Sequence, residues 1–175
     1  MNAGAYGRDI HDVLIRAEAI DSHGNIHDLA VNEMGLSYRH CDIPDDWIFT
    51  KAILRAATDD KAEIARRMTE INDARNTSQP VRSKTGGSTF ANPTPQRAWE
   101  VIDAAGCRGL TIGEAQISPL HCNFMINLGN ASAQDLENLG DEVRKRVMAH
   151  SGIDLRWEIR RIGDRLGQSI VGKDA

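Results

Sequence analysis

The chain has 175 residues, a net charge of −4 and a hydrophobic share of 41%, enough for one ordinary domain or for one domain and part of another. The acidic balance without a basic block argues against nucleic acid as a partner, and the apolar runs are far shorter than the ~20 residues of a membrane helix. Three cysteines without a CxxC spacing indicate neither a disulfide framework nor a zinc site, so we expect no bound metal and a cytoplasmic protein.

The first third of the chain is predicted to be rich in β-structure. Residues 12–20 alternate in a way typical of a strand, residues 21–24 form a turn, and residues 26–29 return as a second strand. Residues 48–57 are a further strand candidate, with β-branched and aromatic side chains near the start. The pattern therefore predicts a hairpin followed by another strand.

A helix is predicted to begin at Asp59. Ile64, Met68 and Ile71 recur at helical spacing, an aspartate stands at the start as a cap, and residues 76–80 end the helix. Residues 81–94 are rich in Gly, Ser, Thr, Asn and Pro, which indicates a loop with one or two short strands.

The remainder alternates between helices and short strands. A helix is expected over 95–105, and short strands over 117–122 and 124–128. Ser132 caps a helix over 133–151 that Gly152 terminates, and residues 153–162 alternate as a closing strand. The fold class expected from these elements is α+β.

The stretch Gly86-Gly-Ser-Thr-Phe-Ala-Asn-Pro93 is the clearest candidate for a functional site. The glycines permit backbone angles with positive φ and a close approach of a ligand to the main chain. The residue before Pro93 is pushed out of the helical region. The stretch is therefore expected to be a rigid turn that presents Ser88, and the pattern leaves open a proton donor, a phosphate cradle or only a tight turn.

An ordered series of motifs runs through the whole chain. It comprises Met1-Asn-Ala-Gly-Ala-Tyr-Gly7, Leu36-Ser-Tyr-Arg39, Gln79-Pro80, the stretch 86–93, Ile102-Asp-Ala-Ala-Gly106, Ala115-Gln-Ile-Ser118, His121-Cys-Asn-Phe124, Asn130-Ala-Ser-Ala-Gln-Asp135 and Leu155-Arg-Trp-Glu-Ile-Arg-Arg-Ile-Gly163. Each motif alone is weak, but their order is specific. The series resembles the UDP-N-acetylenolpyruvoylglucosamine reductases, most closely their shorter type.

The resemblance implies a division of the chain at residue 58. Residues 1–58 would be the C-terminal part of an α+β FAD-binding domain, and residues 59–175 an α+β substrate-binding domain. Family members are about twice as long, the usual scale of two domains. We therefore expect the chain to represent part of such a reductase, without the glycine-rich loop that holds the FAD pyrophosphate.

The sequence departs from the family pattern at three points. Ala91 stands where the family usually has a lysine, Glu114 where it has a glycine, and Cys41 where it has a serine. The missing lysine bears most directly on substrate contacts.

The resemblance also implies the chemistry and the cofactors. NADPH would reduce FAD, and reduced FAD would deliver a hydride to the enolpyruvyl group of a UDP-sugar substrate. Negative charge then develops at C2 and requires stabilisation and a proton. The catalytic positions of the family fall on Ser88 as the proton donor, Arg39 as the clamp on the substrate carboxylate and Glu158 as the residue that completes its polarisation.

Other residues of the family motifs are candidates for binding. Asn2, Ala3, Gly4 and Ala5 match the loop that contacts the flavin, and Tyr38, Asn92 and Gln116 match substrate contacts. Structural alternatives remain for five of the candidates: Ser88 and Asn92 as turn residues, Arg39 in an ion pair with Asp42 or Asp45, Glu158 on a solvated strand face, and Gln116 at a strand end. Arg82 and Lys84 are candidates for the diphosphate. A nucleotide-sugar binding module without redox activity is the main alternative function, and another flavoprotein with a different substrate is a weaker one.

Overall fold

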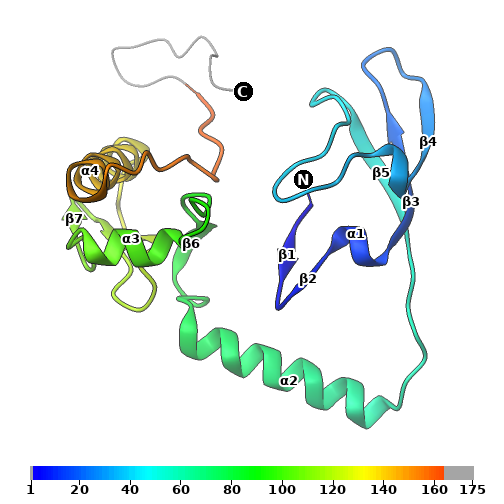
Figure 1. The fold of residues 1–175 in the computed structure, drawn as a ribbon, viewed down its shortest axis with the longest axis horizontal. Coiled ribbons are helices and arrows are strands. Elements are labelled where there is room, and N and C mark those ends of the chain that lie inside the picture. Colours follow the sequence, from blue (N-terminus) through cyan, green and yellow to red (C-terminus); the bar gives the residue numbers. More distant parts are fainter. Residues whose placement is uncertain (1, 164–175) are drawn as a thin grey trace. The chain divides into compact units, whose positions relative to one another are not determined.

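The computed structural model describes residues 2–163 and divides the chain into two units, Met1–Glu63 and Ile64–Ala175 (Figure 1). The division falls inside a long helix, five positions after the expected boundary between residues 58 and 59. Both units mix helices with antiparallel strands, so the α+β class is confirmed. No helix within 2–163 has the length and apolarity of a membrane span.

A three-stranded antiparallel sheet forms the body of the first unit, in the order β4-β3-β5. Its strands are β3 (Leu14–Ile20), β4 (Ile26–Ala30) and β5 (Ile48–Leu54). The predicted hairpin is confirmed, because Arg16 pairs with Ala30 and Ile20 with Ile26. Asp21 closes the turn by accepting backbone N–H bonds from His23 and Asn25, each at 2.9 Å.

The apolar residues of this unit are only partly enclosed. Leu14, Ala17 and Met34 form a small buried cluster. Every residue of β5 is exposed, including Ile48 and Leu54. β5 is also an edge of the sheet, and unpaired edges with apolar side chains favour association with another strand.

The N-terminal segment of the first unit folds as a small hairpin and one helical turn. β1 (Gly4–Ala5) pairs with β2 (Arg8–Asp9), and α1 (Ile10–Val13) follows directly. Asp9 caps this turn, because its side chain accepts the N–H of Asp12 while Asp12 accepts the N–H of Asp9. The carboxylates of Asp9 and Asp12 lie within 4.8 Å of a ring nitrogen of His11, and both already serve as caps.

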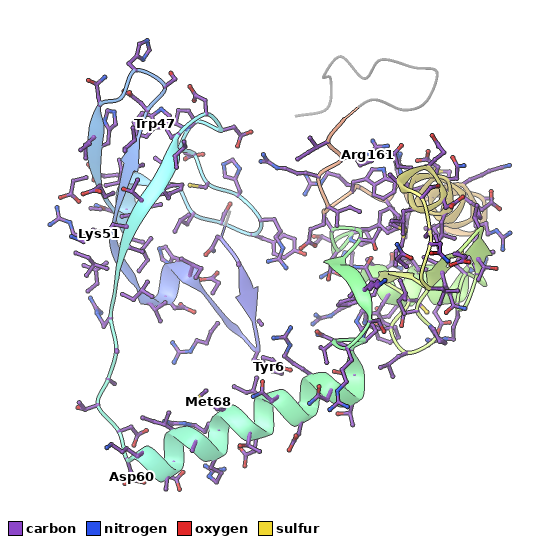
Figure 2. All side chains as sticks on the ribbon, turned by 180° about the vertical axis from the view of Figure 1, so that it is seen from behind. Tyr6, Trp47, Lys51, Asp60, Met68 and Arg161 are labelled. Carbon is purple, nitrogen blue, oxygen red and sulfur yellow. The ribbon has the colours of Figure 1, made fainter. Side chains whose placement is uncertain are left out.

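The helix α2 (Lys61–Ser78) is exposed along its whole length. Asp60 caps its start by accepting N–H bonds from Ala62 and Glu63 at 2.9 and 3.2 Å. Ile64, Met68 and Ile71 lie at helical spacing as expected, but all three are exposed (Met68 is labelled in Figure 2).

The second unit is built on a four-stranded antiparallel sheet in the order β6-β9-β8-β7. The strands are β6 (Lys84–Ser88), β7 (Thr111–Ile112), β8 (Ala115–Ile117) and β9 (Phe124–Asn127). The two-residue strand β7 has no counterpart in the sequence prediction. The helices α3 (Ala98–Ala104) and α4 (Ala133–Ser151) pack with this sheet.

The helix α4 agrees with the sequence prediction at both ends. Ser132 accepts the N–H of Asp135 at 3.1 Å, and Asp135 accepts the N–H of Ser132 at 2.9 Å, which completes a capping box. Gly152 adopts φ 71° and ends the helix in the left-handed conformation. The buried face of α4, with Leu139 and Val143, packs in a core that also contains Ile117 from the sheet.

Three predictions about elements of this unit are wrong. The strand expected over 117–122 ends at Ile117, because Ser118 and Pro119 open a turn that extends to Asn123. The helix expected from 95 begins at Ala98. The closing strand expected over 153–162 does not form: these residues contribute a single bridge, between Phe90 and Trp157.

Candidate functional site

Ser88 is the last residue of β6 and follows a bulge rather than a tight turn. Thr85 pairs with Ile126 and Ser88 with Phe124, so Gly86 and Gly87 add an extra residue to β6 relative to β9. Gly87 has φ 90°, a conformation that side chains with a Cβ rarely adopt. The glycine pair therefore sets the direction in which the half-buried Ser88 leaves the sheet.

The buried side chain of Asn123 holds the chain just after Ser88. Its Oδ1 accepts the N–H of Phe90 at 3.0 Å, and its Nδ2 donates to the C=O of Phe90 at 2.8 Å. The N–H of Thr89 also donates to the C=O of Asn123 at 2.8 Å. The sequence did not single out Asn123 as functional, although it belongs to the motif His121-Cys-Asn-Phe124, because its partner Phe90 lies 33 positions away.

The segment that carries Glu158 lies beside the segment that carries Ser88. The N–H of Glu158 donates to the C=O of Thr89 at 2.9 Å, and the N–H of Ala91 donates to the C=O of Arg156 at 2.9 Å. These two bonds flank the bridge between Phe90 and Trp157. The structure thus brings together the main chains of two of the three predicted catalytic residues.

Gln116 lies on the same face of the sheet as Ser88. Ser88 pairs with Phe124 and Gln116 pairs with Ile126, two positions further along β9. Directly paired residues of antiparallel strands share a face, and so do residues two apart on one strand. The side chain of Gln116 is half-buried and makes no hydrogen bond with residues 2–163.

A cavity of about 450 Å³ lies beside the opposite face of this sheet. Met125 and Ile159 line it together with Leu136 of α4, and Lys84 and Gly87 close it on the side of β6. Ser88 does not line this cavity. The other candidate for the diphosphate, Arg82, is exposed just before β6.

Asn92 has a structural task in the second unit. Its Oδ1 accepts the N–H of Ala98 at 2.9 Å, which satisfies a donor at the start of α3. The preceding Ala91 is buried, so the position of the family lysine offers no charged group here. Glu114, another departure from the family pattern, accepts the N–H of Asn130 at 2.7 Å.

Arg39 adopts an unusual backbone conformation in the first unit. Its φ is 56°, in the left-handed region that favours glycine. The guanidinium carbon lies 5.1 Å from the centre of the Tyr38 ring, and Tyr38 itself is 53% exposed. Strained non-glycine residues are concentrated at functional sites, so this geometry is consistent with a guanidinium held for binding.

The predicted cofactor loop adjoins Tyr38. Asn2 forms a parallel bridge with Tyr38, and its buried side chain is occupied by Asp9, at 2.8 Å, and by the N–H of His11, at 3.0 Å. The C=O of Ala3 accepts the N–H of Ile10. Ala3, Gly4 and Ala5 are all exposed, so this part of the loop, including the outer edge of β1, is open to a ligand.

In the second unit, His121 is half-buried and the thiols of Cys107 and Cys122 are fully buried. Burial lowers the pKa of His121, and the Nδ1 of its ring accepts the N–H of Asn123 at 3.3 Å. Burial raises the pKa of Cys107 and raises that of Cys122 to about 11. Both thiols are therefore uncharged near neutral pH, which does not suit a nucleophile.

Residues 79–162 match the family described as "UDP-N-acetylenolpyruvoylglucosamine reductase, C-terminal domain". This segment is similar to the C-terminal domain of that reductase family. The segment contains Ser88, Asn92, Gln116 and Glu158, so the resemblance inferred from the motifs is confirmed for the second unit.

Curated reductases and a solved reductase structure extend the match to most of the chain. The UDP-N-acetylenolpyruvoylglucosamine reductase of Rhodospirillum rubrum is 55% identical over 99% of this chain, and that of Parvibaculum lavamentivorans is 54% identical over 94%. The crystal structure of the reductase from Thermus caldophilus superposes with a TM-score of 0.78 at 37% identity, over 90% of this chain and 57% of that one. The chain spans about half the length of the curated relatives it matches, 56% and 53% respectively.

Proposed function

We propose that this chain carries substrate-reducing residues of a UDP-N-acetylenolpyruvoylglucosamine reductase, the oxidoreductase that forms UDP-N-acetylmuramate in peptidoglycan synthesis. The proposal is supported chiefly by one observation. Within the segment that matches the reductase family, the C=O of Thr89, the residue after Ser88, accepts the N–H of Glu158. In this proposal residues 1–58 belong to the FAD-binding domain and residues 59–175 to the substrate-binding domain.

The residues present fit a flat cofactor at the edge of β1. Gly4 and Ala5 are small and exposed, and a Cβ on Gly4 would lie only 2.9 Å from the Cβ of Asp9. The hairpin therefore needs glycine at position 4, and the same small residues leave the outer edge open. Bound FAD, reduced by NADPH, would supply the hydride to the enolpyruvyl group.

Ser88 would donate the proton that completes the reduction. A serine hydroxyl is a poor acid in water, so it acts only when it is held within reach of a strongly basic carbon and water is excluded. The bulge at Gly86–Gly87 and the two hydrogen bonds between Asn123 and Phe90 restrict its position. Gln116, on the same sheet face, would offer an amide to the sugar nucleotide.

Arg39 would hold the substrate carboxylate. Its planar guanidinium offers two parallel donors that match a carboxylate. The ring of Tyr38 lies against the guanidinium. Stabilising the negative charge that develops next to this carboxylate lowers the barrier to hydride addition. Glu158 would complete the polarisation of the substrate carboxylate, either in its protonated form or bridged to it by a cation or water. Asn92 would contact the substrate in addition to capping α3.

The binding of UDP-N-acetylglucosamine enolpyruvate to the 175-residue chain tests the assignment. We expect calorimetry to detect binding, and we expect Arg39→Ala to weaken it because the carboxylate clamp is lost. Ser88→Ala should leave this affinity within about twofold but slow any NADPH-dependent reduction by about 10²–10⁴-fold, as loss of a general acid does. Ser83→Ala, a nearby exposed serine, is the matched control.

A nucleotide-sugar binding module without redox activity is the second candidate. It is favoured by the separate core of the second unit, the part of the chain that the family model covers. Binding of the UDP-sugar without any reduction, also when FAD, NADPH and the remaining part of a reductase are supplied, would support this alternative. Absence of UDP-sugar binding would refute both.

A further inference from the structure

The buried face of α4 contains a glycine that its backbone does not require. Gly140 lies between Leu139 and Val143 in the middle of the helix, where glycine is less favourable than alanine. A Cβ at this position would lie 1.9 Å from Cη2 of Trp157 and 2.7 Å from its Cζ3. The indole ring of Trp157 therefore rests directly on the helix backbone, in a notch that only glycine leaves open.

Packing fixes the Trp157 ring on its other sides. The ring of Phe90 lies 4.9 Å away between centroids, tilted by 41°, and the guanidinium of Arg161 lies over the indole at 4.9 Å (Arg161 is labelled in Figure 2). The buried indole Nε1–H has no acceptor among residues 2–163. Since no hydrogen bond orients the ring, the shape of the notch and its two neighbours determine where it sits.

The residues on either side of Trp157 hold the candidate site together. Arg156 accepts the N–H of Ala91, and Glu158 donates to the C=O of Thr89, each at 2.9 Å. Thr89 directly follows Ser88. A displacement of the indole would therefore shift both hydrogen bonds and change the position of Glu158 relative to Ser88.

We propose that Trp157 is a positioning residue. Its indole packs in the notch that Gly140 leaves on α4, and this packing fixes the segment of Glu158 against the segment of Ser88. The inference rests on the proposed function for its consequence in catalysis. Its structural content, the coupling between position 140 and the Glu158 segment, stands on the packing alone.

Amide hydrogen exchange of the full chain, measured by NMR, tests this coupling. In Gly140→Ala the added methyl group must displace the indole, so exchange at the Glu158 and Ala91 amides should rise by about tenfold or more. The buried amides of Ile117 and Met125 should stay within about twofold. Lys145→Ala, an exposed substitution on the same helix, is the matched control and should change neither set.

The second arm is a compensating substitution. Phenylalanine at position 157 lacks the ring atoms that occupy the notch, so Trp157→Phe alone should also speed exchange at Glu158. The double variant Gly140→Ala/Trp157→Phe should bring that exchange back toward the wild-type rate, because the methyl group then fills the space that the indole leaves. Neighbouring residues in contact show such non-additive effects.

The outcomes separate a positioning role from general destabilisation. Unchanged exchange at Glu158 in both single variants, an equal rise at all core amides, or failure of the double variant to recover would each overturn the proposal. If Gly140→Ala does not fold, Trp157→Phe alone decides by the same comparison. Calorimetry with UDP-N-acetylglucosamine enolpyruvate addresses the function separately: wild-type chain that binds none refutes the proposed function, whereas the exchange data still decide the coupling.

Discussion

Replacing Asn123 by alanine removes the side chain that holds Phe90 from both of its backbone polar groups. Asn123 is 4% exposed and Phe90 is fully buried, so water does not reach the N–H and C=O that lose their partner. Each buried group left unsatisfied costs about 1–3 kcal/mol, which gives about 2–6 kcal/mol for the pair. Domains of this size are stable by about 5–15 kcal/mol, so a large part of the stability of the second unit depends on this amide.

Urea unfolding in a Trp47→Phe background measures the effect. Trp47 belongs to the first unit, so the remaining fluorescence comes from Trp99 and Trp157 of the second. We expect a markedly lower midpoint for Asn123→Ala at an unchanged slope. A loss below about 1 kcal/mol would refute the reasoning, because it would mean that the two hydrogen bonds to Phe90 are replaced without cost.

Asn123→Asp is the matched control for shape. Its carboxylate still accepts the Phe90 N–H, but its second oxygen meets the Phe90 C=O, which repels an ionised acid and accepts a bond from a protonated one. Burial and this repulsion raise the pKa of the introduced acid in the folded state, so the variant should become less stable as pH rises through that raised value. A stability difference from wild type that is the same at all pH values would contradict this account.

Three further predictions concern other parts of the chain. Burial lowers the pKa of His121, so the folded state binds its proton less readily than the unfolded state; the second unit should lose stability as pH falls through the ordinary histidine value of about 6.5, and His121→Gln should flatten that dependence in calorimetric scans. Ser132→Ala removes the cap of α4 and should cost about 0.5–2 kcal/mol in urea unfolding. The exposed edge strand β5 should make the chain self-associate, and replacing Ile48 and Leu54 by lysine should shift sedimentation toward monomer.

Each of these three has a simple control. Unchanged pH dependence in His121→Gln would show that other groups cause the loss of stability. Ser132→Thr keeps an acceptor oxygen and should retain most of the cap, so equal losses for alanine and threonine would contradict the capping role. Lysines introduced at the exposed Ile64 and Met68 of α2 change the net charge equally; if they disperse the chain as well as the β5 variants do, charge and not the strand edge is responsible.

The elements that the sequence predicted well are those whose causes are local. The bounds of α4 follow from Ser132, Asp135 and Gly152, all within or beside the helix, and the first hairpin follows from a turn that Asp21 closes on its own neighbours. The wrong predictions are those that depended on distant partners. Residues 153–162 alternate like a strand, but only Trp157 finds a bridge, because the four-stranded sheet is already formed by other segments.

The candidate site was predictable only in part for the same reason. Ser88 and Glu158 were found because their motifs resemble a family, and their proximity depends on bonds to Thr89 that no local pattern encodes. Asn123 was missed because its partner Phe90 is remote in the chain. The notch at Gly140 was missed because no local pattern near Gly140 indicates that Trp157 packs there. A glycine inside an otherwise regular apolar helix face is the one signal that the sequence offered for it.

The left-handed backbone at Arg39 has a consequence for attempts to stabilise this protein. A side chain with a Cβ in that conformation costs about 1–2 kcal/mol relative to glycine. A search that ranks variants by thermal resistance alone would therefore select Arg39→Gly, and under the proposed function it would discard the group that grips the substrate. Position 39 is thus a place where tolerance to heat and competence in catalysis call for different residues, and libraries built on this chain should keep it fixed.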